Sequence, residues 1–138
     1  METVPTCLQI PWRQSNSITD QNINVIANDN STNQENAPNK VFAVIVVSTD
    51  TLDHELQLGI MNHSEDFYVL GTVMVPAQAG STSTVPSVNV MTSIPALPLD
   101  ETGQPHLYLD ATDSLEVKVL SPISDGCDID VTVFGADF

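Results

Sequence analysis

The chain has 138 residues, with 18 acidic and three basic side chains, and carries a formal net charge of −15 at pH 7. Proteins that bind nucleic acids or anionic membranes do so through many Lys and Arg side chains, so this charge disfavours direct binding to DNA, RNA, phosphorylated ligands or anionic lipid. Apolar residues make up 41% of the chain, enough for one folded domain spanning residues 1–138.

Apolar residues in the N-terminal part alternate with period two, the pattern of strands with one buried face. The first two predicted strands are marked by Leu8, Ile10 and Trp12, and by Ile23 and Val25 with Ile18 as a further candidate. The first strand lies within an expected extended N-terminal segment, a possible arm of residues 1–17. Residues 28–39 are almost all polar and predict a loop with turn residues throughout.

The apolar run at residues 41–47 predicts a central strand covered on both faces. Alternation at residues 56–60 and 67–75, around a polar tetrapeptide, predicts a hairpin. Residues 76–83 predict a loop, and a short strand follows around Val88 and Val90.

The C-terminal part predicts a turn at residues 100–105, a strand at 107–109 and two alternating strands at 115–119 and 129–133. We expect the last two to form a hairpin. About eight short strands with Gly and Pro turns predict an all-β fold, an antiparallel β-sandwich of the jelly-roll kind. A seven-stranded immunoglobulin-like sandwich is the nearest alternative.

Catalytic motifs are lacking in the sequence, which has no Gly-x-Ser-x-Gly elbow and no phosphate-binding glycine loop. We therefore predict that the protein is not an enzyme and has no cofactor. His54, His63 and His106 lie in three separate turn regions without zinc-type spacing, so they are expected to be surface histidines. A small hydrolase is the least favoured hypothesis.

Acidic residues near the C-terminus leave calcium binding open as an alternative, because calcium takes oxygen ligands from clustered carboxylates. The candidates are Asp110, Asp113, Asp125, Asp128 and Asp130. Alternating acids on a strand are more often a solvated face, and we predict no metal site. If these residues do bind calcium, a carbohydrate-binding or adhesive sandwich is the alternative function.

Cys7 and Cys127 lie near opposite ends of the chain, so a disulfide would require the terminal strands to meet. Free thiols are the favoured state, because residues 1–7 lack the features of a secretory signal and predict synthesis in a reducing compartment.

The C-terminal third, from Leu107 to Val119 and from Asp128 to Phe134, resembles the closing hairpin of tailed-bacteriophage capsid decoration, or cement, proteins. The resemblance covers about 30 residues and rests on a strand, an Asp-Ala-Thr-Asp-Ser-Leu turn, a strand, a Ser/Gly loop and a final strand. It implies a virion protein on the capsid surface that binds the major capsid protein or another virion protein, commonly as a homotrimer.

Contacts for such an assembly are expected in the N-terminal segment through Trp12, in the polar loop of residues 28–39 and at the last residue. The candidates are Cys7, Leu8, Ile10, Trp12 and Phe138. Trp12 is the strongest, because Trp is enriched among the residues that dominate binding energy at interfaces. An ordinary core position is the competing interpretation of Trp12.

Overall fold

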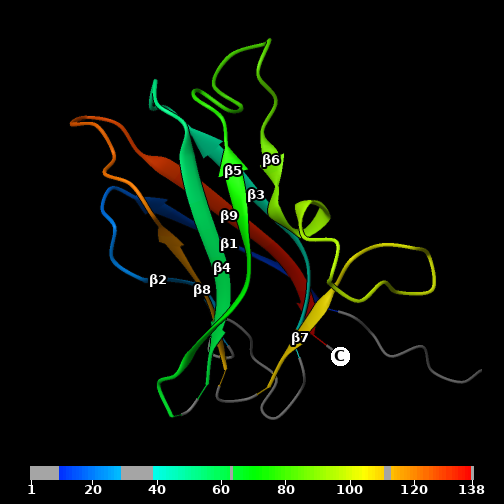
Figure 1. Ribbon diagram of the computed structural model, residues 1–138. Coiled ribbons are helices and arrows are strands. Elements are labelled where there is room, and N and C mark those ends of the chain that lie inside the picture. Colours follow the sequence, from blue (N-terminus) through cyan, green and yellow to red (C-terminus); the bar gives the residue numbers. More distant parts are fainter. Residues whose placement is uncertain (1–9, 29–38, 63, 111–112, 138) are drawn as a thin grey trace, which may run out of the picture.

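A computed structural model describes residues 10–28, 39–62, 64–110 and 113–137 of the chain. In these ranges, nine strands form two antiparallel sheets that pack face to face as a sandwich (Figure 1). The predicted all-β sandwich is therefore confirmed.

Sheet A has five strands: β1 (Ile10–Ile18), β3 (Asn39–Ser48), β6 (Val88–Asn89), β7 (Leu107–Leu109) and β9 (Ile129–Asp137). Sheet B has four: β2 (Asn24–Asn28), β4 (His54–Met61), β5 (Phe67–Val75) and β8 (Ser114–Val119). A short 3₁₀ helix, η2 (Val90–Ser93), follows β6, and no helix in the described residues is long and apolar enough to cross a membrane.

Strands pair from the two ends of the chain toward its middle. Sheet A has the order β1-β9-β3-β6, with β7 also paired to β3, and sheet B has the order β2-β8-β4-β5. The hairpin β4–β5 is the centre of this arrangement, and β2–β8 and β1–β9 are successive outer pairs. This is the jelly-roll arrangement predicted from the sequence, and it excludes the immunoglobulin-like order.

The core lies between the sheets and consists of alternate side chains from both. On β3, Val41, Val44 and Val46 are fully buried, whereas Ile45 and Val47 on the outer face are half-buried. The expectation that this strand is covered on both faces is therefore only half right. A continuous apolar run shows that a strand is central in its sheet, but it does not show what covers the second face.

The N-terminal strands differ from their predicted bounds. Ile18 belongs to the end of β1, not to the second strand, and residues 10–17 of the expected arm are paired with β9 of the same chain. Residues 1–9 lie outside the described residues, as do residues 29–38 of the predicted polar loop. The sequence misses residues 13–17 because polar side chains occupy both faces of this edge strand.

The predicted C-terminal hairpin is wrong. β8 pairs with β2 and β4 in sheet B, while β9 pairs with β1 and β3 in sheet A. The connection at residues 120–128 therefore crosses from one sheet to the other (Figure 1). Period-two alternation identifies the buried face of each strand, but it carries no information on which neighbour supplies the hydrogen bonds. The β4–β5 hairpin, by contrast, is confirmed.

Candidate functional site

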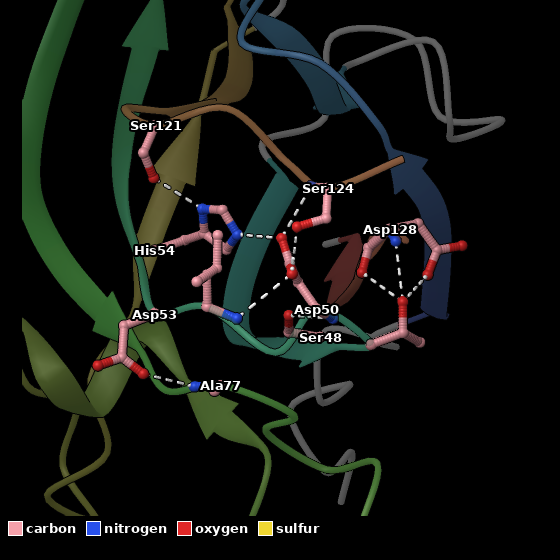
Figure 2. A network of polar contacts seen from close by, with 10 residues as sticks. Ser48, Asp50, Asp53, His54, Ala77, Ser121, Ser124 and Asp128 are labelled. Atoms are coloured by element: carbon pink, nitrogen blue, oxygen red, sulfur yellow. Dashed lines mark hydrogen bonds and ion pairs between the residues drawn. The ribbon is translucent and has the colours of Figure 1, made fainter. Parts of the chain in front are cut away.

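A buried polar cluster lies at one end of the sandwich, where three connections meet (Figure 2). Asp50 comes from the β3–β4 turn, His54 begins β4, and Ser121 and Ser124 follow β8. The His54 ring bridges two partners, with Nδ1 2.7 Å from the Ser121 hydroxyl and Nε2 2.7 Å from Asp50 Oδ2. The side chains of His54 and Asp50 are 1% and 0% exposed.

Asp50 accepts hydrogen bonds from four donors. The Ser124 amide donates at 2.9 Å and its hydroxyl at 2.8 Å, the Leu52 amide donates at 3.3 Å, and His54 completes the set. These donors, the Ser124 amide first and His54 second, hold the pKa of Asp50 well below its usual range. An ionised carboxylate only accepts, so His54 Nε2 carries the proton and donates to it.

A Ser–His–Asp order is also the order of a hydrolase triad, which makes Ser121 a formal candidate nucleophile. The geometry does not favour this role. A catalytic imidazole must pass a proton to a leaving group, and the His54 ring is enclosed by protein, with 1% of its surface exposed. The arrangement instead joins two connections through buried, satisfied hydrogen bonds.

The same end of the sandwich is fastened by further contacts. The Ser81 hydroxyl donates to the Ser48 carbonyl at 2.7 Å, and the Ser48 amide donates to the Ala79 carbonyl at 2.8 Å. On the far side of Asp50, Thr49 exchanges hydrogen bonds with Asp128. The β3–β4, β5–β6 and β8–β9 connections are thereby tied together, and we call this set of contacts the loop clamp.

The sequence did not predict the loop clamp, and the prediction that His54 is a surface residue is wrong. His54 is the buried first residue of β4, not a surface histidine. A signal was present in the sequence, because His54 has the same parity as Leu56 and Leu58, which face the core. His106 is half-buried and packs edge-to-face on Tyr108, with ring centroids 5.2 Å apart. His63 lies outside the described residues.

The predicted interface residue Trp12 lies on β1, at the edge of sheet A. It packs against the core, and its ring lies over Gly135, where a Cβ atom would come within 2.6 Å of the indole. An open depression of about 270 Å³ lies beside it, lined by Pro11, Trp12, Arg13 and Phe134. Trp12 is thus both a partly buried core residue and part of a mostly apolar surface.

The other interface candidates are not brought together by the described part of the chain. Ile10 begins β1 and pairs with Asp137. Cys7, Leu8 and Phe138 lie outside the described residues. Cys127 is a half-buried free thiol in the β8–β9 connection.

The candidate calcium ligands are dispersed. Asp113 accepts from the amide of Asp110, which closes a local turn, and Asp128 accepts from Ser17 and Thr49. Asp125 is exposed in the β8–β9 connection, and Asp130 lies on β9. Within the described ranges, no three His, Cys, Asp or Glu side chains gather closely enough to hold a metal ion.

Comparison with known proteins gives no relative: no protein-family model and no curated protein matches the chain.

Proposed function

We propose that the protein is a structural virion protein that self-associates and binds a capsid lattice, stabilising the particle as decoration proteins do. The observation that carries this proposal is the depression at Trp12, Arg13 and Phe134, which presents aromatic and aliphatic surface beside one of the three basic side chains of the chain. Trp and Arg are the residue types that most often dominate protein–protein binding energy. The proposed partner is the major capsid protein or another virion protein.

The outer face of sheet B offers a second surface for contact with a particle. Val25, Val69 and Met74 are 40%, 48% and 51% exposed. Val25 and Met74 lie opposite Glu116 and Glu55 in neighbouring strands, on the face turned away from the core. Several exposed apolar side chains on one sheet favour an interaction role over a purely solvated surface.

The fold and the charge are compatible with this role. Jelly rolls occur in viral capsid proteins and also in lectins, so the architecture supports an assembly protein without selecting it. The net charge of −15 disfavours contact with the packaged nucleic acid and favours a position outside the capsid shell.

The test is cosedimentation of the purified protein with heads of the phage that encodes it. Trp12→Ala should weaken binding at least tenfold, the loss expected for an aromatic anchor. Leu52→Ala is the control, because Leu52 is an apolar residue 55% exposed in the β3–β4 turn, outside both proposed contact surfaces. Thermal unfolding of both variants separates lost binding from lost folding.

Two results would contradict the proposal. The first is the absence of any wild-type protein in the head fraction. The second is a Trp12→Ala protein that unfolds at a much lower temperature while its folded fraction binds as well as wild type.

A further inference from the structure

Strand β1 is an edge strand, with β9 as its one strand neighbour among the described residues. Edge strands expose unpaired backbone groups that can pair with another chain. We propose that β1 pairs antiparallel with β1 of a second copy, so that two copies of sheet A join across a two-fold axis. This inference rests on the self-association in the proposed function and names the surface that mediates it.

Charge favours this edge. The chain has 18 acidic residues, yet none of them lies at residues 10–19, whereas Arg13 is exposed in the middle of β1. Two copies with a net charge of −15 repel each other over most of their surfaces. Strand β1 is a place where they can approach without opposing carboxylates.

Unpaired polar atoms gather on the same strand. In the described part of the chain, four buried side-chain polar atoms have no hydrogen-bond partner, and three of them are Trp12 Nε1, Gln14 Oε1 and Asn16 Nδ2. These three side chains alternate along one face of β1 and are half-buried. A buried polar atom without a partner is costly. These atoms are enclosed within the single chain, but their side chains are half-buried, so the side chains would turn toward the strand edge to meet partners on a second chain.

One register gives partners to two of these three atoms, Trp12 Nε1 and Gln14 Oε1. With the two-fold axis at Gln14, each Gln14 lies opposite its equivalent, and Trp12 lies opposite Asn16 of the second copy. A carboxamide both donates and accepts, so the Gln14 side chain of one copy can pair with the Gln14 side chain of the other. The side-chain oxygen of Asn16 in one copy can accept a hydrogen bond from the Trp12 indole N–H of the other. Directly opposite residues have Cβ atoms about 4.5–5.5 Å apart, within reach of these contacts.

The same register places Arg13 opposite Ser15, with no acid facing an acid. A contact of identical patches closes as a dimer. Pairing through β1 therefore predicts a dimer, whereas the resemblance to decoration proteins implies a trimer. The absolute mass in solution distinguishes the two.

Charge variants at the two-fold axis test the pairing. Gln14→Glu and Gln14→Lys each place like charges opposite each other and should each weaken the dimer by roughly tenfold or more. An equimolar mixture of the two variants should form a heterodimer, because the charges then complement. Gln57→Glu is the matched control, since Gln57 is a half-buried glutamine in the middle of β4 in sheet B.

The measurement is light scattering after size exclusion, at low salt and at about 0.5 M salt. Salt screens the repulsion between the acidic copies and should strengthen the wild-type dimer. Trp12 is the single Trp of the chain, so its fluorescence should change with protein concentration in wild type and in Gln57→Glu. Circular dichroism establishes that each variant is folded.

A disulfide cross-link tests the register of the β1–β1 pairing. It also tests the pairing itself if a charge variant does not fold. In a Cys7→Ser, Cys127→Ser background, oxidised Gln14→Cys should form a covalent dimer, because Cα atoms of opposite residues are within disulfide range. Ser15→Cys should not, since Ser15 faces Arg13.

The outcomes separate the two proposals. A wild-type oligomer whose mass is unchanged by the Gln14 variants would overturn pairing through β1 and leave self-association standing. A wild-type monomer at high protein and salt concentration would overturn both pairing and self-association. A β1 dimer that fails to bind heads would contradict the proposed function alone.

Discussion

Substitution of His54 tests whether the loop clamp stabilises the fold. His54 makes two side-chain hydrogen bonds, one to the Asp50 carboxylate and one to the Ser121 hydroxyl. Replacing His54 by Asn or by Gln removes one of these two hydrogen bonds at a time. An Asn carboxamide reaches the position of Nδ1, beside Ser121, and a Gln carboxamide reaches the position of Nε2, beside Asp50. His54→Asn therefore loses the carboxylate contact, and His54→Gln loses the hydroxyl contact.

The two losses differ in size. A hydrogen bond to a charged group contributes about 1.5–3 kcal/mol and a neutral one about 0.5–1.5 kcal/mol. One kcal/mol corresponds to about 4 °C in Tm for a domain of this length. We therefore expect Tm to fall by about 6–12 °C in His54→Asn and by about 2–6 °C in His54→Gln.

Differential scanning calorimetry at neutral pH measures both values. Ser121→Ala is the control for the smaller loss and should match His54→Gln within about 2 °C, since both remove the same contact. The reasoning would be refuted if His54→Asn melted with wild type, or if the Gln variant were the less stable of the two.

Two further predictions concern acid stability and the packing of Trp12. Hydrogen bonds hold the pKa values of Asp50 and Asp100 well below the ordinary value of 3.8, so the unfolded chain takes up protons first as the pH falls. The stability that these carboxylates contribute is then complete above about pH 5 and decreases as the pH falls below about 4; urea unfolding between about pH 2 and 7 should show this loss, and Asp50→Asn should make it shallower. Gly135→Ala places a Cβ atom 2.6 Å from the Lys40 carbonyl and against the Trp12 indole, so it should cost about 1–3 kcal/mol and shift the Trp fluorescence. Gly103→Ala is also destabilising, because Gly103 has a φ of +84°, but open space surrounds its Cβ position, so it should leave the Trp fluorescence unchanged. An unshifted emission spectrum in Gly135→Ala would contradict the packing of the indole on Gly135.

Much of the fold could be predicted because a strand with one buried face has apolar and polar residues in alternation along the sequence. The runs at β4, β5, β8 and β9 show which side chains face the core, and Gly and Pro residues mark the turns. The β4–β5 hairpin was predicted correctly because a short connection leaves the chain no other neighbour to pair with. Strand β1 was truncated in the prediction because Gln14 and Asn16 break the apolar alternation at a sheet edge.

Little of the candidate site could be predicted, since it depends on contacts between distant residues. Asp50 meets Ser124 across 74 positions of sequence, and His54 meets Ser121 across 67. No spacing rule connects them, because the register of two sheets decides which turns share an end of the sandwich. His54 alone carried a local signal, its parity with Leu56 and Leu58.

The sequence by itself determined the class of the fold and the charge of −15, because each of these follows from composition or from local periodicity. Only the tertiary structure decided that β8 and β9 belong to different sheets and that Trp12, Gln14 and Asn16 line one edge with unpaired polar atoms. Hydrogen-bond partners of a strand are chosen by long-range packing. A surface for another chain becomes visible only when it is known which polar groups that packing leaves unsatisfied.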